Sequence, residues 1–295
     1  MRAALIFNPK AGRGKSKQLQ LPHVVSRLEE GGMVVTPMPT ERIGHAYDLS
    51  RSAASDGYDL VIAWGGDGTL NEVAFGLAGG DTRLGVLPGG TVNVFARETG
   101  IPLKLDGAID VLVHGTPQRI PLGLANDRPF LLMAGLGLDG EVVYRLKAGF
   151  KSALGALAFW LDGFRLLASY RMAPLRIRVG DEEMEGTGVI AGKIRRYGPR
   201  YVITPDAKLD EARLDVVVFT GKNRRDYLRY LIGVLLGFHL KFGDVRHFKT
   251  SAVDIDVPSG DPVRYQLDGE PSGYAPLKLR VMDRALVVIL PNRSD

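Results

Sequence analysis

Cysteine is absent from the 295 residues of the chain. Disulfides and cysteine-ligated metals are therefore excluded, and we expect a reducing, cytoplasmic location. Long apolar runs are also lacking, since none approaches the roughly 20 residues that span a bilayer. The N-terminal apolar run reaches Asn8-Pro9 too early for a signal-peptide core. Any contact with a membrane is expected to be peripheral, at its inner face.

Neither sign of charge dominates: 38 Lys and Arg residues stand against 33 Asp and Glu residues, a formal net charge of +5. This mild excess suits anionic partners such as nucleotides or acidic lipid surfaces. Basic and aromatic residues do not interleave in a recognised nucleic-acid motif, so nucleic acid is not an expected partner. The length accommodates two domains, each with its own core.

The most informative stretch is residues 60–73. Its apolar start predicts a buried strand, and Gly65-Gly66-Asp67-Gly68 turns the chain into a helix with Thr69 as cap and Glu72 completing a capping box. Glycines let a phosphate approach the backbone, and a new helix offers N–H groups. We interpret Asp67 as reaching Mg²⁺ on a nucleotide, directly or through water. The alternative is a tight turn with a solvated aspartate.

A basic glycine loop, residues 10–16, precedes a helix that should end near Glu30. It is not a Walker loop, because Pro9 stands where that motif requires glycine. The dinucleotide fingerprint fails at Lys17. The loop either touches phosphates or is a solvated connection.

Short apolar runs alternate with helical patterns in the first part of the chain, which predicts a parallel sheet with helices on both faces. Ligands of such sheets bind at the carboxyl ends of the strands. The predicted strands are residues 3–7, 34–35, 60–64 and 84–87.

After Ile120 the pattern changes to strand-like runs joined by Gly, Pro and Asp turns, which predicts a mostly antiparallel second domain, a sandwich or barrel. We place the domains at residues 1–118 and 119–279. A terminal pair of strands, 277–281 and 285–290, could close either domain. The other runs are 119–125, 130–134, 175–179, 187–191, 201–204, 214–219, 252–257 and 263–267.

Two helical patterns interrupt these strands, at residues 146–164 and 228–242, and basic residues lie among or beside their apolar positions. They either pack into the core with solvated flanks, or form an apolar lip through which acyl chains reach the site while cations meet anionic headgroups.

A further glycine loop, Pro88-Gly89-Gly90-Thr91-Val92-Asn93, again precedes a helix. Together with Asn8-Pro9 and Gly65-Gly66-Asp67-Gly68-Thr69-Leu70-Asn71-Glu72, it resembles the diacylglycerol kinase catalytic family, which includes sphingosine and ceramide kinases and bacterial soluble lipid kinases. The resemblance implies an NAD-kinase-like α/β domain, a β-sandwich domain, and a tail of about 280–295 that returns to the first domain.

The resemblance also implies transfer of the γ-phosphate of ATP, with Mg²⁺, to a lipid hydroxyl of a diacylglycerol-like or sphingoid acceptor at a membrane surface. Asp67 would manage the metal. The nucleotide-binding positions that it implies are Asn8, Thr40, Gly65, Gly66, Asp67, Gly68, Thr69, Leu70, Asn71, Gly90, Thr91 and Asn93.

The incoming hydroxyl needs a base to accept its proton. The family's Asp-Gly-Glu carries that base, and the position carries over to Glu270 in Asp268-Gly269-Glu270. Without the resemblance, Asp-Gly favours an ordinary hairpin turn.

The chain departs from the family in three places. Many bacterial relatives have Asp where this chain has Val94 and Pro121, near the metal and the lipid headgroup, which weighs against diacylglycerol itself. Relatives often bind a structural Mg²⁺ at an Asp-Asp-Gly loop, where this chain has Asp210-Glu211-Ala212. Glu211 and the carbonyls of Lys208 and Arg213 would be the ligands here.

Two other functions stay open. An NAD kinase-like enzyme shares the Gly-Gly-Asp-Gly motif, and a non-catalytic nucleotide- or lipid-binding regulator could keep the fold without turnover. Whether the chain forms a homodimer is also left open.

Overall fold

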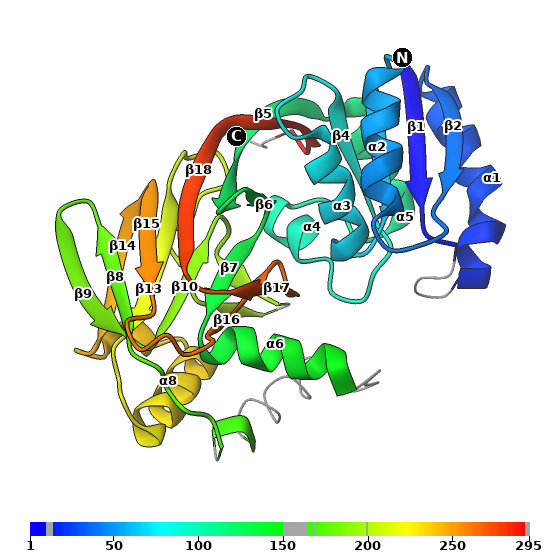
Figure 1. The fold of residues 1–295 in the computed structure, drawn as a ribbon. Helices are drawn as coiled ribbons and strands as arrows, with labels where there is room; N and C mark the ends of the chain where they lie inside the picture. The colour runs from blue at the N-terminus through cyan, green and yellow to red at the C-terminus, as the bar shows by residue number, and fades with distance from the viewer. Residues whose placement is uncertain (10–13, 150–164, 168, 199, 293–295) are drawn as a thin grey trace. The chain divides into compact units, whose positions relative to one another are not determined.

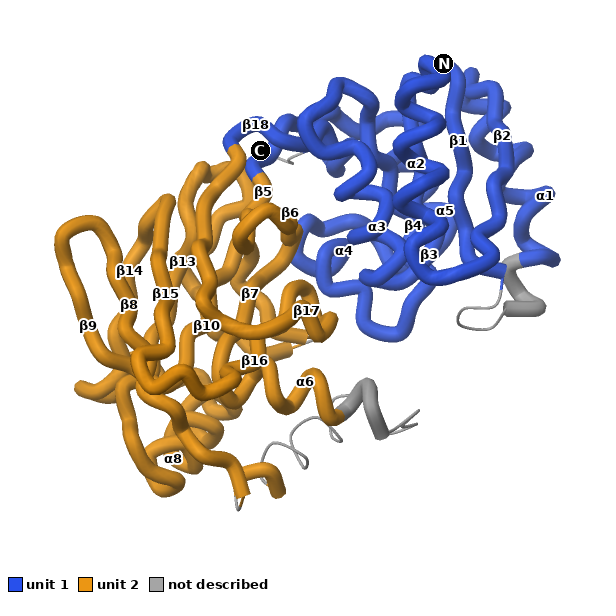
Figure 2. Tube along the Cα trace, viewed as in Figure 1, with its two compact units in different colours: residues 1–121, 283–295 blue, residues 122–282 orange. Residues whose placement is uncertain are grey.

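The computed structural model describes residues 1–9, 14–149, 165–167, 169–198 and 200–292. The chain forms two compact units, residues 1–121 with 283–295, and residues 122–282 (Figure 2). The domain boundaries predicted from the sequence were after residue 118 and near residue 280.

Unit 1 is built on a parallel sheet with strand order β2-β1-β3-β4 (Figure 1). Every residue of β3 is buried, as its apolar sequence predicts. The C-terminal part of β18, through Val287 and Val288, adds a further parallel strand beside β4. The strands are β1 Arg2–Phe7, β2 Val34–Pro39, β3 Leu60–Gly65, β4 Arg83–Pro88 and β18 Leu277–Leu290.

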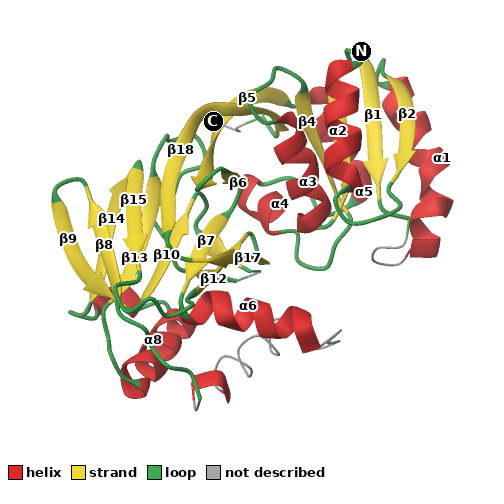
Figure 3. Cartoon of the chain, viewed as in Figure 1, coloured by secondary structure: helices red, strands yellow, loops and turns green. Residues whose placement is uncertain are grey.

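Helices cover both faces of this sheet (Figure 3). Arg27 of α1 donates to Asp110 of α5 at 2.9 Å, which ties these two helices together. On the other face α2 packs closely on α3, because a Cβ on Gly76 would lie 1.9 Å from the Ser50 hydroxyl oxygen. The helices are α1 Gly14–Glu30, α2 His45–Ser55, α3 Asp67–Leu77, α4 Val94–Thr99 and α5 Leu105–His114.

Unit 2 is a β-sandwich. One sheet is antiparallel, with order β14-β13-β10-β7-β16-β17. The other contains the N-terminal part of β18 with β15, β8 and β9, also antiparallel. Buried side chains from both sheets, such as Val216 and Ile255, form one core. The predicted fold class, an α/β domain followed by an antiparallel sandwich, is confirmed.

The strands of unit 2, with β5 running into it from unit 1, are β5 Thr116–Ala125, β6 Arg128–Phe130, β7 Met133–Leu136, β8 Leu175–Val179, β9 Glu182–Gly186, β10 Gly188–Gly192, β11 Arg196–Tyr197, β12 Tyr201–Val202, β13 Leu214–Phe219, β14 Val245–Thr250, β15 Ala252–Asp256, β16 Arg264–Leu267 and β17 Glu270–Tyr274. The described part of unit 2 contains the helices α6 Leu138–Gly149 and α8 Arg224–Leu236, the short 3₁₀ helix His239–Lys241, and helical residues 165–167. No described helix combines the length and apolar character needed to cross a bilayer.

Several predicted elements have different bounds in the structure. The strand predicted at 130–134 is interrupted, because backbone N–H groups at 131–133 donate to the carboxylate of Asp268. The terminal pair of strands is one strand, β18, which contributes to both units.

The predicted helical patterns also differ. The helix of 228–242 ends at Leu236, because Gly237 adopts a left-handed conformation with φ of 77°. The helix of 146–164 begins earlier, at Leu138, and residues 150–164 lie outside the described residues.

Candidate functional site

The carboxyl ends of the parallel strands bring several predicted nucleotide-binding residues to one edge of the unit 1 sheet. Asn8 follows β1 and Thr40 follows β2, and the Thr40 N–H donates to the Phe7 carbonyl at 2.8 Å. The Gly89 N–H after β4 donates to the Gly65 carbonyl of β3 at 2.7 Å. Loops that are far apart in the sequence therefore share one edge, where α/β sheets bind ligands.

Two glycine loops meet there at van der Waals contact. A Cβ added to Gly90 would lie 2.5 Å from the Cα of Gly66, a distance that real side chains do not tolerate. A Cβ on Gly65 would lie 2.5 Å from the Thr69 Cβ. The loops therefore require glycine for backbone packing, and the same lack of side chains would let an anion approach their backbone closely.

Asp67 lies where these loops join. It is the first residue of α3, and its Oδ1 accepts a hydrogen bond from the Val94 N–H at 2.8 Å. Burial raises its pKa, and the N–H groups at Phe95, Val94 and Asn93 oppose that shift. The carboxylate therefore accepts a hydrogen bond from the first residue of α4. It is half-buried, and a nearby cation would favour its ionised form.

The predicted capping box is wrong. Gly66, and not Thr69, is the N-cap of α3, and the Thr69 side chain packs against Gly65. Glu72 instead accepts hydrogen bonds from the N–H groups of Gly44 at 2.9 Å and Ala46 at 3.1 Å. Glu72 therefore caps the neighbouring helix α2. Helix α3 already begins at Asp67, so Glu72 lies in the second turn of α3, beside the start of α2.

Asn93 shapes its own loop. Its Oδ1 accepts from the Gly90 N–H, and its Nδ2 donates to the Gly90 carbonyl, each at 2.9 Å. Its backbone is left-handed, with φ of 52°, a conformation that Asn tolerates better than most residues. Thr91 lies exposed on the loop that this ring of hydrogen bonds closes.

The buried Asn71 has an Oδ1 atom with no hydrogen-bond partner among the described residues. A buried acceptor of this kind is destabilising unless a ligand or water supplies a donor. Asn71 is therefore a candidate contact for a bound nucleotide or its water.

In unit 2, the predicted base lies next to a two-residue hairpin turn. Asp268 and Gly269 both have positive φ, 54° and 80°, which is the type I′ geometry that Asp-Gly favours. Glu270 follows as the first residue of β17, opposite Leu267, and is partly exposed. The turn is thus the ordinary hairpin that the sequence allows, and it also fixes the backbone of Glu270.

Asp268 anchors this hairpin. Its carboxylate accepts hydrogen bonds from the N–H groups of Leu131, Leu132 and Met133 at 2.7 to 2.9 Å, and its own N–H donates to the Met133 carbonyl. The side chain is 9% exposed. The first residue of the predicted Asp-Gly-Glu motif therefore has a positioning role.

We expect Asp268→Asn to lower the free energy of unfolding by about 2 to 4 kcal/mol. An amide keeps one acceptor oxygen but turns an NH₂ group toward a backbone N–H. Urea unfolding would measure the loss, with Asp181→Asn, at an exposed turn of the same unit, as the matched control. Equal midpoints for the two variants would contradict the anchoring role.

A buried carboxylate that sequence reasoning missed supports the same turn. The Gly269 N–H donates to Gln266 Oε1 at 2.7 Å, and Gln266 Nε2 donates to Asp139 Oδ2 at 2.8 Å. A Cβ on Gly135 would lie 1.7 Å from that Oδ2. An isolated aspartate after the glycine-rich run Gly135-Leu136-Gly137-Leu138 was the available signal.

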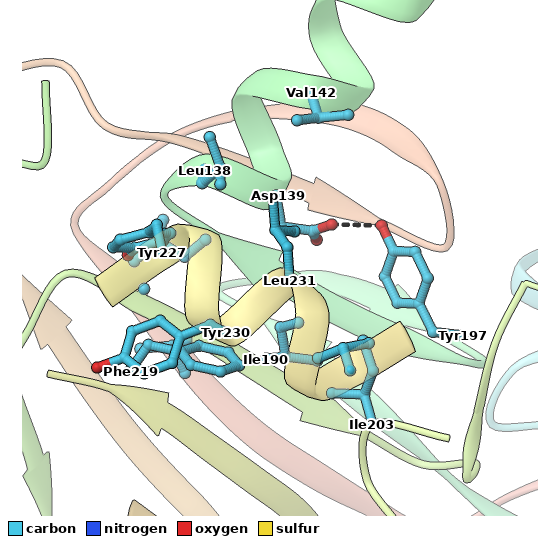
Figure 4. Close-up of a pocket in the computed structure, with 14 residues that line it drawn as sticks. Leu138, Asp139, Val142, Ile190, Tyr197, Ile203, Phe219, Tyr227, Tyr230 and Leu231 are labelled. Carbon is cyan, nitrogen blue, oxygen red and sulfur yellow. Dashed lines mark hydrogen bonds between the residues drawn. The ribbon is translucent and has the colours of Figure 1, made fainter. Parts of the chain in front are cut away.

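Asp139 faces a small apolar cavity of about 80 Å³ (Figure 4). Tyr197 donates a hydrogen bond to its Oδ1, and burial raises the pKa of Asp139. Leu138, Val142 and Leu231 are among the apolar lining residues.

The residues predicted to hold a structural metal do come together, but around a lysine. The carbonyl oxygens of Lys208, Glu211 and Arg213 all accept hydrogen bonds from Lys193 Nζ. The donor set therefore does not fit a metal ion at this loop. Sequence reasoning missed Lys193, whose signal was a lone lysine within an apolar run, Val189-Ile190-Ala191-Gly192-Lys193-Ile194.

Known proteins resemble both units. A family model described as the diacylglycerol kinase catalytic domain matches residues 2–125, and one described as the YegS C-terminal NAD kinase beta sandwich-like domain matches residues 133–290. A diacylglycerol kinase of Staphylococcus aureus (strain MRSA252) is 32% identical over 295 residues, covering 99% of this chain and 93% of that protein.

Solved structures agree. A candidate diacylglycerol kinase of Bacillus anthracis superposes with a TM-score of 0.81 at 26% identity, covering 98% of this chain and 96% of that one. A second structure from B. anthracis, with a TM-score of 0.79 at 23% identity, supports the fold. The family that the glycine motifs indicated is confirmed. The chain belongs to the diacylglycerol kinase family.

Proposed function

We propose that this protein is a lipid kinase, which transfers the γ-phosphate of ATP, bound with Mg²⁺, to a lipid hydroxyl. Family membership supports a lipid kinase. The observation that carries the proposal is the position of Asp67, at the contact of two glycine loops and at the carboxyl edge of a parallel sheet. Phosphoryl transfer needs this combination of close backbone approach and charge neutralisation.

The proposed role of unit 1 is to hold the nucleotide. The glycine loops would admit the phosphates to backbone N–H groups, and Asp67 would hold Mg²⁺, which neutralises charge on the phosphates when bound. No described residues form a group of three or more His, Cys, Asp or Glu side chains placed for a metal. One carboxylate with phosphate oxygens and water is a common set of ligands for Mg²⁺, so the residues fit.

Val94 contributes no carboxylate at this place. Its contact with Asp67 is made through its backbone N–H, and its side chain is buried. The proposal therefore assigns the metal to Asp67 alone among the candidate carboxylates of the glycine loops.

The proposed role of Glu270 is general base. The lipid oxygen forms a bond to the γ-phosphorus, the bond from that phosphorus to the bridging oxygen breaks, and ADP leaves. The hydroxyl proton passes to the Glu270 carboxylate. Asp268 and the Gln266–Asp139 pair position the hairpin that carries it.

The acceptor class is supported by the outer face of α8. Leu228, Ile232 and Leu236 are spaced four residues apart and are 44%, 40% and 69% exposed. A hollow at the start of α8 is lined by Arg171, Lys222 and Arg224-Arg225, of which Lys222 pairs with Glu185 at 3.0 Å. An exposed apolar ridge beside clustered cations suits a membrane with anionic headgroups. We propose peripheral binding to such a surface.

Charged substitutions on this ridge should weaken membrane binding. We expect Ile232→Asp combined with Leu236→Asp to lower partitioning onto anionic vesicles by roughly tenfold or more, because two apolar side chains lose their burial in the interface. Vesicle sedimentation would measure it. Ile43→Asp, at a 95% exposed position of unit 1, is the matched control. Equal binding of both proteins would contradict the proposed surface.

Purified protein incubated with γ-labelled ATP and Mg²⁺ tests the function itself. The acceptors, offered singly in mixed micelles, are diacylglycerol, monoacylglycerol, sphingosine, ceramide and phosphatidylglycerol, with NAD as a separate aqueous acceptor. Label in one lipid, lost in Asp67→Asn, is the expected result. Label in NAD alone would replace the proposal with an NAD kinase-like activity. ATP binding without labelling of any of these acceptors would favour an acceptor outside this set or a non-catalytic nucleotide- or lipid-binding regulator.

A further inference from the structure

A buried ammonium group occupies the centre of the loop between β12 and β13. Lys193 has no solvent exposure, although lysine is rarely buried without a partner. Its Nζ donates to the carbonyl oxygens of Lys208 at 3.4 Å, of Arg213 at 3.1 Å, and of Glu211. An ammonium carries three N–H donors, so it can donate to all three of these carbonyls.

Lys193 is also held at its backbone. It follows directly on β10, and its N–H donates to the Leu132 carbonyl at 2.8 Å. The side chain is therefore fixed at its base by one strand neighbour and at its tip by the loop. Withdrawing it would leave a charge without its acceptors inside unit 2, which is destabilising.

Glu211, the side chain predicted as a metal ligand, is engaged elsewhere. Glu211 accepts from Lys249 at 2.8 Å and pairs with Lys208 at 2.9 Å. These two lysines lower the pKa of Glu211 to about 2, so the carboxylate is ionised and already neutralised. It does not supply the uncompensated negative charge that a divalent ion needs.

A second pair closes the other end of the loop. The Asp206 N–H donates to Asp215 Oδ2 at 2.7 Å, while Asp215 Oδ1 pairs with His247 at 2.6 Å. The polar groups that fold the loop over Lys193 are therefore satisfied by the protein itself.

From these contacts we infer that Lys193 is the resident cation of residues 204–213, in place of the structural metal ion that relatives often bind there, and that this loop binds no divalent ion. Two cations do not share three carbonyl oxygens, because they repel each other at such distances. The ammonium group donates to all three of these oxygens, so it occupies the position that a metal ion bound to them would need.

The first test measures divalent-ion dependence without nucleotide. The unfolding temperature is recorded by calorimetry in chelator, in Mg²⁺ and in Ca²⁺, and bound Mn²⁺ is counted by electron paramagnetic resonance. Asp67→Asn is measured beside the wild type, because it removes the proposed ion of unit 1. The unfolding temperature of Asp67→Asn should be the same in all three solutions, with no bound Mn²⁺. A higher unfolding temperature in Mg²⁺, or a bound Mn²⁺ that Glu211→Gln loses, would overturn the inference.

The second test removes the ammonium. Lys193→Met keeps the length of the side chain but leaves three buried carbonyls without donors, so its unfolding temperature should fall by roughly 5 to 10 °C. Lys208→Met, the same change at an exposed lysine of the same loop, should shift it by less than about 2 °C. Equal shifts for the two variants would overturn the inference. If Lys193→Met does not fold, the first test decides alone.

Discussion

Replacing Asp67 by asparagine is expected to lower the rate of phosphoryl transfer about a thousandfold, because the charge that would hold Mg²⁺ is worth several kcal/mol in such sites. The fold should be unaffected. Asparagine keeps an oxygen that can accept from the Val94 N–H, and Asn is as good a helix cap as Asp. Turnover of labelled lipid and the unfolding temperature would be measured on the same preparations.

This substitution separates two roles of one side chain. If Asp67 only accepts the N–H at the start of α4, asparagine should replace it without loss of turnover. Full turnover in Asp67→Asn would therefore contradict the proposal that Asp67 holds the metal. Glu72→Gln is the matched control, since Glu72 also accepts two N–H groups at a neighbouring helix start. Glu72→Gln should lower the unfolding temperature and leave the rate of phosphoryl transfer almost unchanged.

The pH dependence of nucleotide binding gives a second readout. Burial raises the pKa of Asp67 above its ordinary value of 3.8, so its carboxylate becomes neutral at a higher pH than an exposed aspartate does. Affinity for the Mg²⁺–nucleotide complex should therefore fall as the pH is lowered from neutral toward that raised pKa. Asp67→Asn should bind weakly at every pH and lack this decline.

The sheet of unit 1 could be predicted because its signals are local. Apolar runs such as residues 60–64 end in glycines, and a helix follows each turn, so periodicity and turn chemistry give the order of elements. Chain order then implies that the carboxyl ends lie on one edge. The contact of Gly66 with Gly90 is consistent with that logic, although its tightness becomes visible only in three dimensions.

Other features depend on tertiary packing and have no local signature. Glu72 stands at capping-box spacing from Thr69, yet it caps α2, because the helix begins two residues before Thr69 and a different helix lies beside it. Lys193 donates to carbonyl oxygens of residues 208–213, a loop that comes later in the chain. In both cases the hydrogen-bond partners come from segments that are distant in the sequence, so the tertiary fold determines them.

The glycines show the same contrast between local sequence signals and requirements set by tertiary packing. Gly237 ends α8 through its own left-handed backbone, a local property that the sequence could have suggested. Gly135 is required because the Asp139 carboxylate occupies the place of its side chain. Only the folded structure shows that second requirement, since Asp139 reaches Gly135 by the packing of α6 on β7.

Glu270→Gln is expected to lower turnover by about a hundredfold to ten-thousandfold, the range typical of a lost general base. Affinity for ATP should change little, because the nucleotide loops belong to unit 1 and Glu270 belongs to unit 2. The amide has the same shape as the carboxylate but accepts no proton from the lipid hydroxyl. Single-turnover kinetics with saturating lipid, together with equilibrium binding of ATP, would separate the two effects.

Two outcomes would contradict this role. Turnover equal to that of the wild type would place the base elsewhere, and parallel losses in turnover and ATP affinity would indicate a folding defect or a change in unit 1. Glu182→Gln, at an exposed position of β9, controls for the substitution itself. Asp268→Asn tests positioning at the same turn. It should lower the free energy of unfolding, because the Asp268 carboxylate holds the hairpin backbone. Under conditions where this variant is folded, its turnover should exceed that of Glu270→Gln, because Glu270 is still present to accept the proton.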